Sequence, residues 1–248
     1  MTPAALTIAG TDPTGGAGIA RDLFSFARAG VRGLLAVTAV TVQDEHGVRG
    51  WHEVPADVLS AQIDAARGLG VDAVKTGMLP SAGAIRTVVA ALDLFDGPLV
   101  VDPVLAAGTG GALSDASALD VLRAELIPRA ILVTPNAPEA GALTGVAVVD
   151  EETAAEAALA LVARGARNVL VTGGHLSGDQ IVDVLEGDAG SLRWRSGRVE
   201  GIDTHGTGCA LSAGICAGLA TGLGLADAIE RAIEHVGEWL AAGGWRAR

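Results

Sequence analysis

The segment with the clearest chemical signal is DTHGTGCALSAGICAGLA, residues 203–220. Its polar turn leads directly into an apolar helical pattern, so backbone amides should converge at a helix N-terminus. Free N–H groups and the macrodipole stabilise an anion there, such as a phosphoryl group in transfer. The amides concerned belong to Gly206, Thr207, Gly208 and Cys209. The same field would lower the pKa of the Cys209 thiol and make it reactive. The alternative is a helix whose glycines only permit close packing.

A second glycine-rich segment, GTDPTGGAGIARD (10–22), follows an apolar strand pattern. Closely spaced glycines ahead of a helix let a ligand approach the backbone. The segment has neither the lysine of a P-loop nor the full spacing of a dinucleotide fingerprint. Asp12 and Asp22 favour a binding site over the alternative, which is a plain strand–helix turn with a glycine-rich cap.

Polar residues at two further strand ends predict a magnesium site. Asn136 and Glu139 lie in TPNAPEA (134–140) after an apolar strand pattern, and Asp102 follows LVV. Carboxylate and amide oxygens at a strand's carboxyl end can organise Mg²⁺ and its waters. The alternative is structural, with Asn136 as an N-cap and Glu139 in the first helical turn. Because a buried unpaired carboxylate is costly, we expect Asp102 to have a ligand, a metal or a capping partner.

Lys75 is the only lysine in the chain. It ends a buried strand pattern in VKTGM and is a candidate site residue, whereas the alternative is a solvated lysine at a strand end. The histidines show no metal-ligand spacing, and only His205 adjoins a candidate site. Cys209 and Cys216 are the only cysteines, and without a CxxC pair they predict neither a disulfide framework nor a zinc site. We expect Cys216 to be a buried packing residue.

The charge of the chain limits its partners. Lys+Arg 17 against Asp+Glu 29 gives a net charge of −12, which repels polyanions, so nucleic acid and anionic membranes are not expected as partners. A small anion such as ATP remains compatible, because backbone amides and a metal can hold it. The apolar run over 209–225 contains glycines and is short for a membrane span of roughly 20 residues. No signal-peptide pattern is seen, so we expect a cytoplasmic protein.

Strand and helix patterns alternate along the chain and must position these residues. Buried strands are predicted for 4–10, 33–42, 72–77, 97–104, 129–136 and 167–174. Helices are predicted for 21–30, 55–70, 81–95, 114–127, 150–165, 206–222 and 224–243, and a hairpin for 178–200. Repeated βαβ units imply an α/β fold with a mostly parallel sheet that binds ligands outside the carboxyl ends of its strands. With no linker pattern, one domain over 1–248 is expected.

In chain order, these segments resemble the hydroxymethylpyrimidine/phosphomethylpyrimidine kinases of thiamine biosynthesis, which belong to the ribokinase-like superfamily. The motifs that carry the resemblance are TIAGTDPTGGAGIARDL (7–23), AVTAVTVQDEHGV (36–48), VKTGML (74–79), VVDPV (100–104), TPNAPEA (134–140), VTGGH (171–175) and DTHGTGCALSAGI (203–215). They span nearly the whole chain. The same branch includes a class of pyridoxal kinases.

The resemblance implies a three-layer α/β/α sandwich that transfers phosphoryl groups, with ATP and Mg²⁺, to a primary alcohol and then to the resulting phosphate. It implies a pyrimidine pocket at Gly10, Asp22, Gln43 and Met78. The anion hole would map to residues 206–209, with Cys209 where many sugar-kinase relatives carry an aspartate base. Nucleotide contacts are expected at Asn136, Thr172 and His205, and metal contacts at Glu139 and Asp102. Relatives are commonly dimers, so a homodimer is expected.

Three departures from the family pattern keep other functions open. Thr172 stands where the family usually has a lysine associated with ATP phosphates. The stretch LAAGTGGAL (105–113) lacks the lysine of the usual MVAKSG-like loop, and AAGGWRAR (241–248) replaces a GPVHH-like tail. One alternative is a pyridoxal kinase, in which a cysteine could add to the aldehyde. The other is a non-catalytic sensor of a pyrimidine or a nucleotide.

Overall fold

An eight-stranded sheet organises the part of the chain that the computed structural model describes, which is residues 2–44, 46–106, 113–114, 116–199, 201 and 204–244. Its strand order is β10-β9-β8-β7-β6-β5-β1-β2. The strands from β8 to β2 in this order run parallel, while β9 and β10 add antiparallel pairings at one edge. The bounds are β1 (Ala4–Ala9), β2 (Arg32–Val37), β5 (Ala73–Thr76), β6 (Leu99–Val101), β7 (Leu132–Val133), β8 (Asn168–Val171), β9 (Gln180–Gly187) and β10 (Leu192–Gly197).

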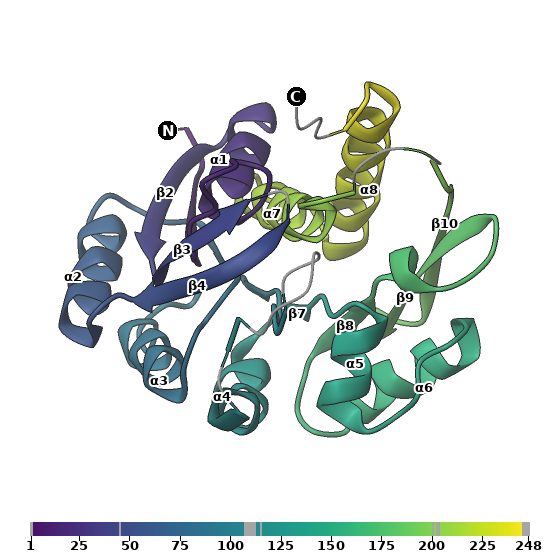
Figure 1. Ribbon diagram of the computed structural model, residues 1–248, viewed down its shortest axis with the longest axis horizontal. Helices are drawn as coiled ribbons and strands as arrows, with labels where there is room; N and C mark the ends of the chain where they lie inside the picture. Colours follow the sequence, from purple (N-terminus) through teal and green to yellow (C-terminus); the bar gives the residue numbers. More distant parts are fainter. Residues whose placement is uncertain are drawn as a thin grey trace.

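Helices cover both faces of this sheet (Figure 1). One face carries α2 (Ala56–Arg67), α3 (Ala82–Ala91), α4 (Ala116–Val121), α5 (Ala137–Thr144) and α6 (Glu151–Val162). The other face carries α1 (Gly18–Arg28), α7 (Thr207–Ala220) and α8 (Leu225–Ala241). Among these helices and the rest of the described residues, none is long and apolar enough to cross a membrane.

The alternating direction of side chains along each strand explains why the sheet has a hydrophobic core on each of its faces. Successive strand residues point to opposite faces, so an unbroken apolar run fills both sides. Val100 and Leu132 pack with α7 and α8, whereas their neighbours Val101 and Val133 pack with the helices of the other face. The α/β fold with a mostly parallel sheet is therefore confirmed, as is the hairpin expected within 178–200.

The prediction of one strand over 33–42 is wrong. The run divides at Thr38 into β2 and β3 (Ala39–Asp44), and β3 pairs with β4 (Gly47–Glu53) in a separate two-stranded sheet. Thr38 is fully buried at this corner, where its hydroxyl donates to the Met78 carbonyl at 2.7 Å. Such a corner depends on distant parts of the chain, so an apolar run by itself does not reveal it.

Two helical segments also differ from expectation. The helix predicted for 114–127 begins as α4, continues as a π-helical turn (Leu122–Leu126) and ends in a 3₁₀ turn (Ile127–Arg129). The short helix α5 was not predicted, although the structural alternative for Asn136 placed an N-cap at its start.

Strand β1 marks the point at which the strand order changes direction. It lies between β2 and β5. The chain therefore continues from β1 to β2 on one side and later adds β5 on the other side. The crevice outside the carboxyl ends at such a switch point is the usual ligand position in an open α/β sheet. The segments that leave these ends begin at Gly10 after β1 and Gly77 after β5. The fold thus brings the glycine-rich 10–17 loop to this crevice.

Candidate functional site

The loop that follows β1 is tightly folded around its glycines. A Cβ at Gly10 would lie 2.8 Å from the Met78 sulfur, and one at Gly18, where φ is +57°, would lie 2.5 Å from the Gly10 carbonyl oxygen. The Ile19 amide donates to that same carbonyl at 3.1 Å. Gly10 and Met78, both predicted pocket residues, therefore meet at the switch point.

Asp12 is the polar centre of this loop. Its carboxylate accepts hydrogen bonds from the amides of Thr14 at 2.9 Å and Ala17 at 2.8 Å, and from the Thr14 hydroxyl. His205 Nε2 lies 2.9 Å from the same carboxylate. Burial by itself raises the pKa of Asp12, but these hydrogen bonds outweigh it and bring the pKa to about 2. Asp12 is therefore an acceptor in every contact at neutral pH.

The N-terminus of α7 has the form expected of an anion site. Gly206 enters the helix with φ +81° and no side chain caps the first turn. The first helical bond runs from the Ala210 amide to the Gly206 carbonyl at 2.9 Å, so Gly208 and Cys209 precede it. The Thr207 amide already donates to the Thr204 carbonyl at 3.2 Å. The amides in best position for an anion are thus those of Gly208 and Cys209.

The expectation of a lowered thiol pKa at Cys209 is wrong. Burial raises the pKa of Cys209 to about 12, and the nearby carboxylates of Asp22 and Asp102 add to the rise. Lys75 acts in the opposite direction but does not compensate. The desolvation of this corner of the fold exceeds the stabilisation that a helix N-terminus gives to a thiolate. Cys209 is a neutral thiol at pH 7.

Lys75 forms a buried ion pair beneath the anion site, so the alternative of a solvated lysine is wrong. Its Nζ lies 3.0 and 2.9 Å from the two carboxylate oxygens of Asp22, and both side chains are fully buried. The Thr7 hydroxyl donates to the same carboxylate at 2.6 Å. Burial alone would lower the pKa of Lys75, but the carboxylates of Asp22 and Asp102 outweigh it and raise that pKa. Asp22 thus lies among protein partners, and its contact with a substrate stays a prediction.

Asp102 has the protein partners that its burial requires. The Ser212 hydroxyl on α7 donates to it at 2.8 Å, and Lys75 Nζ lies 3.9 Å away. Burial nevertheless raises the pKa of Asp102. Ser212 was not identified from sequence, where it reads as an ordinary small helix residue. Its contact ties the first turns of α7 to the end of β6.

Asn136 and Glu139 form a reciprocal capping box at the start of α5, which confirms the structural alternative of an N-cap at Asn136 and a first-turn position for Glu139. The Glu139 amide donates to Asn136 Oδ1 and the Asn136 amide to Glu139 Oε2, both at 2.9 Å. Burial, with repulsion from Asp102, raises the pKa of Glu139 to about 8. Two buried carboxylates that repel each other would gain from a cation between or beside them.

Thr172 lies beside this cap and begins a tightly bonded loop. It forms a parallel bridge with Asn136, and the amide of the next residue, Gly173, donates to Asp183 at 2.8 Å. Burial raises the pKa of Asp183 to about 6. Further along, the guanidinium of Arg198 donates to three backbone carbonyls of the loop, those of Gly174, Leu176 and Gly178. Sequence analysis identified neither Asp183 nor Arg198.

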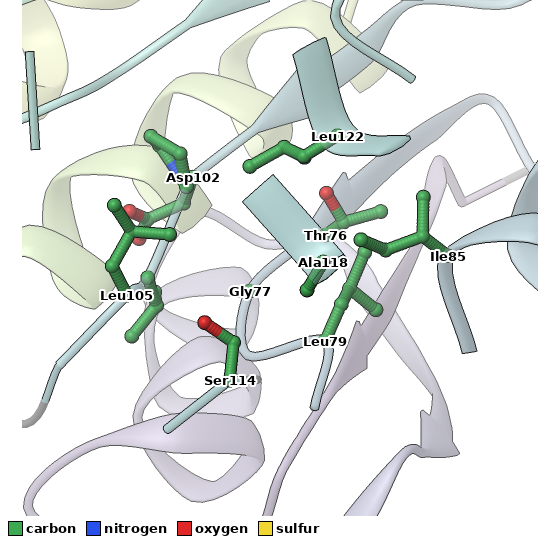
Figure 2. Close-up of a pocket in the computed structure, with 11 residues that line it drawn as sticks. Thr76, Gly77, Leu79, Ile85, Asp102, Leu105, Ser114, Ala118 and Leu122 are labelled. Carbon is green, nitrogen blue, oxygen red and sulfur yellow. The ribbon is translucent and has the colours of Figure 1, made fainter. Parts of the chain in front are cut away.

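A small cavity lies outside the carboxyl ends of β5 and β6 (Figure 2). It is lined by Thr76, Gly77, Leu79, Ile85, Asp102, Pro103, Val104, Leu105, Ser114, Ala118 and Leu122. Asp102 is the predicted site residue among them. Within the described chain, the buried hydroxyls of Thr76 and Thr134 have no hydrogen-bond partner. A small polar group placed beside Asp102 could satisfy Thr76, whereas the rest of the lining is mainly apolar.

The structure gathers the predicted residues into two groups. Gly10, Gln43, Met78, His205 and the anion turn lie around the switch point, where Gln43 Nε2 approaches His205 Nε2 to 3.4 Å. Asn136, Glu139 and Thr172 form the second group, which is linked to Asp102 by charge repulsion. Of the predicted departures, residues 107–112 of the 105–113 stretch and residues 245–248 of the tail lie outside the described residues.

A mostly parallel open sheet with a glycine-rich helix N-terminus at its switch point is an arrangement typical of phosphate-binding α/β proteins. The family model for phosphomethylpyrimidine kinase matches residues 12–245. A hydroxymethylpyrimidine/phosphomethylpyrimidine kinase of Streptomyces coelicolor is 44% identical over 243 residues, which cover 97% of this chain and 90% of the relative. The chain therefore belongs to the phosphomethylpyrimidine kinase family, whose members are phosphotransferases with the ribokinase-like fold.

Two solved structures support the same assignment. Phosphomethylpyrimidine kinase from Clostridium difficile has a TM-score of 0.85 at 32% identity and covers 96% of this chain and 100% of its own. Pyridoxal kinase from Staphylococcus aureus, in complex with AMP-PCP and pyridoxal, has a TM-score of 0.91 at 29% identity over 100% of this chain and 91% of its own. The three-layer arrangement is thus confirmed.

Proposed function

We propose that this chain transfers the terminal phosphoryl group of ATP to the hydroxymethyl group of 4-amino-5-hydroxymethyl-2-methylpyrimidine, and a second one to the resulting monophosphate. The observation that carries the proposal is the uncapped start of α7 beside the loop after β1, in a chain of this family. The curated relatives bear the name of this activity over nearly the full length of the chain.

Different residues of the site would bind the pyrimidine ring, the phosphoryl group and the nucleotide. Gly10 and Met78 offer close backbone approach and an apolar wall for a flat ring, while Gln43 offers an amide at the same crevice. The amides of Gly208 and Cys209 would face the phosphoryl group as its charge develops. Asn136 and Thr172 lie at the nucleotide side, and AMP-PCP in the Staphylococcus aureus structure supports ATP as the donor.

The transfer breaks the bond between the terminal phosphorus and the ADP oxygen and forms one to the substrate oxygen. In a loose transition state the hydroxyl proton leaves late and passes to water or to an oxygen of the transferred phosphoryl group, so positioning matters more than a strong base. A thiol with a pKa of about 12 is neutral at pH 7 and cannot accept that proton. We therefore assign two roles to Cys209. Its backbone amide faces the phosphoryl group, and its neutral thiol orients the hydroxyl of the substrate.

Mg²⁺ fits the site through few protein ligands. Within the described residues no group of three or more His, Cys, Asp or Glu side chains gathers for a metal. Mg²⁺ in kinases needs only one or two carboxylates, with phosphate and water oxygens as its other ligands. Asp102 and Glu139 would hold it, since burial together with repulsion from Asp102 raises the pKa of Glu139 to about 8 and a cation would relieve both. The ion would supply positive charge to the phosphate oxygens.

The remaining expectations are part of the same proposal. A single domain over 1–248 is supported by the one sheet to which both β2 and β10 belong. A homodimer is supported by the exposed apolar side chains of Val40 and Val42 on β3. We place the protein in the cytoplasm, and nucleic acid and membranes remain outside its expected partners because of its charge.

Mass identification of the products tests the proposal. Purified protein with Mg-ATP and the pyrimidine alcohol should form ADP, then the pyrimidine monophosphate, then the diphosphate. Cys209→Ala keeps the backbone amide and should lower kcat about tenfold with little loss of stability, which separates the thiol from the amide. A folded wild-type protein that binds the pyrimidine but forms no ADP would contradict the proposal and favour a sensor.

Pyridoxal kinase activity is the second candidate. The Staphylococcus aureus pyridoxal kinase, in complex with AMP-PCP and pyridoxal, matches the whole of this chain with a TM-score of 0.91, which supports pyridoxal as a candidate substrate here. Pyridoxal assayed at the same concentration as the pyrimidine alcohol decides between them. A larger kcat/KM for pyridoxal would make this candidate the main function.

A further inference from the structure

Two segments far apart in the sequence are held together at the switch point. The 10–17 loop follows β1, and the turn at 204–206 precedes α7. A Cβ at Gly206 would collide with the Gly16 carbonyl, and one at Gly16 would lie 2.5 Å from the ring of His205. The backbones are therefore in direct contact, and the Cδ2–Nε2 edge of the His205 ring faces the loop.

The polar contact in this junction is between His205 and Asp12. Nε2 of His205 lies 2.9 Å from Asp12 Oδ2, and the two side chains are 14% and 2% exposed. Because the pKa of Asp12 is about 2, its carboxylate is ionised and can only accept. His205 must then carry a proton on Nε2 and donate it to Asp12. This nitrogen is therefore used in a contact within the protein.

Asp12 itself is held from several sides. It accepts from the amides of Thr14 and Ala17, so its position is set by the loop backbone. The loop is held in turn by Arg21, whose Nε donates to the Gly16 carbonyl at 3.1 Å and whose guanidinium stacks 4.1 Å from the Trp239 ring of α8. The acceptor for His205 is therefore a rigid one.

The turn that His205 occupies determines where the anion-binding amides point. His205 directly precedes Gly206, whose left-handed φ of +81° starts α7, and no side chain caps that helix. We propose that His205 is a positioning residue: its hydrogen bond to Asp12 fixes this turn against the 10–17 loop and so aims the Gly208 and Cys209 amides at the phosphoryl group. The inference rests on the proposed function and adds to it the residue that aligns the two loops.

Gln43 extends the junction towards the ring-binding side. Its Nε2 lies 3.4 Å from the same His205 nitrogen, at a bulge in β3. Because this nitrogen donates its proton to Asp12, Gln43 Nε2 lies beside His205 without donating a hydrogen bond to it. Alignment errors of about 1 Å can cost about a hundredfold in rate, so the expected effect of losing the bond falls on kcat.

Matched substitutions at His205 separate the hydrogen bond from the bulk of the ring. His205→Gln places an amide N–H near the position of Nε2, His205→Leu fills similar space without a donor, and His205→Asn has a donor too short to reach Asp12. His52→Leu, at an exposed histidine on β4, is the control. For each variant we would measure kcat, KM for ATP and pyrimidine, the melting temperature, and hydrogen exchange of the Thr207 and Ala210 amides, which donate to the Thr204 and Gly206 carbonyls of this turn.

The proposal predicts that His205→Leu and His205→Asn lower kcat tenfold or more while both KM values stay within threefold. His205→Gln should retain kcat within threefold, and exchange of the Thr207 and Ala210 amides should accelerate in the Leu and Asn variants only. A His205→Leu enzyme within twofold of wild-type kcat would overturn the proposal. So would a Gln variant as impaired as the Leu variant, or a loss confined to KM for ATP, which would indicate direct nucleotide contact.

Hydrogen exchange keeps this test separate from the proposed function. If the wild-type protein fails to phosphorylate the pyrimidine, the proposed function fails, yet faster exchange of the Thr207 and Ala210 amides in His205→Leu would still show that the bond fixes the turn. Unchanged exchange in that variant would overturn the positioning role whatever the activity.

Discussion

Nζ of Lys75 lies 3.0 and 2.9 Å from the two carboxylate oxygens of Asp22, and neither side chain has any exposed surface. The pair joins β5 to α1 directly behind the turn that begins α7. Asp102, 3.9 Å from the same Nζ, extends the cluster to β6. Lys75, the only lysine of the chain, thus supplies the positive charge of the buried cluster that it forms with Asp22 and Asp102.

Removal of Lys75 should be strongly destabilising. Lys75→Met leaves Asp22 as a buried charge without its partner, which typically costs about 3–5 kcal/mol of the free energy of unfolding. Urea unfolding monitored by circular dichroism measures the change. The double variant Lys75→Met/Asp22→Leu should recover much of the loss, because it removes both charges. A single variant within about 1 kcal/mol of wild type would contradict the role of the pair.

The thiol of Cys209 should react slowly with alkylating reagents. With a pKa of about 12 its thiolate fraction at pH 7.5 is roughly a thousandfold below that of an ordinary cysteine. In a Cys216→Ala background, the rate of iodoacetamide modification should rise about tenfold per pH unit up to pH 10, without a plateau. A plateau between pH 7 and 8 would show a lowered pKa and restore the idea of a reactive thiolate.

Glu139 should make stability depend on pH near neutrality. Its pKa, about 8 in the folded protein, lies above the ordinary value of 4.5, so the folded state holds the proton more tightly. The stabilisation is complete below pH 4.5 and is lost as the pH rises through 8, with a slope of about 1 kcal/mol per unit.

Glu139→Gln keeps a capping acceptor and removes the titration. Without Mg²⁺, the difference in unfolding free energy between wild type and Glu139→Gln should therefore shift steadily against the wild type from pH 5 to pH 8. Two parallel curves over that range would show that Glu139 has an ordinary pKa.

Thr172→Lys should strengthen the nucleotide side of the site. The resemblance to the family implies a lysine where this chain has Thr172, which lies next to Asn136 at the start of the loop that Arg198 organises. A cation at this position should lower KM for ATP about tenfold, the size of one charge-assisted hydrogen bond. Thr172→Met, of similar length and no charge, is the control. Equal KM values for the Lys and Met variants would exclude an electrostatic contribution at residue 172.

Local sequence patterns predicted the sheet and its helices because buried strands and capped helices have signatures within a few residues. Asn136 as an N-cap is one such signature, which the sequence offered only as an alternative to a magnesium site, and the structure confirms it. The corner at Thr38 and the partners of Lys75 depend on contacts across the fold, so no window of sequence contains them.

Cys209 shows the same limit in its chemistry. A helix N-terminus is visible in sequence and predicts a lowered pKa, but desolvation is a property of everything packed around the thiol and reverses the sign. Asp12 and His205 were both noted as candidates, yet their hydrogen bond spans most of the chain and appears only in the folded protein.

The most direct test of the central claim is the ratio of kcat/KM for the pyrimidine alcohol to that for pyridoxal, measured with wild-type protein and Mg-ATP. The account predicts a ratio of at least about ten in favour of the pyrimidine, because the crevice of a phosphomethylpyrimidine kinase should pair the ring's polar groups. A ratio below one would contradict it and assign the protein to pyridoxal phosphorylation.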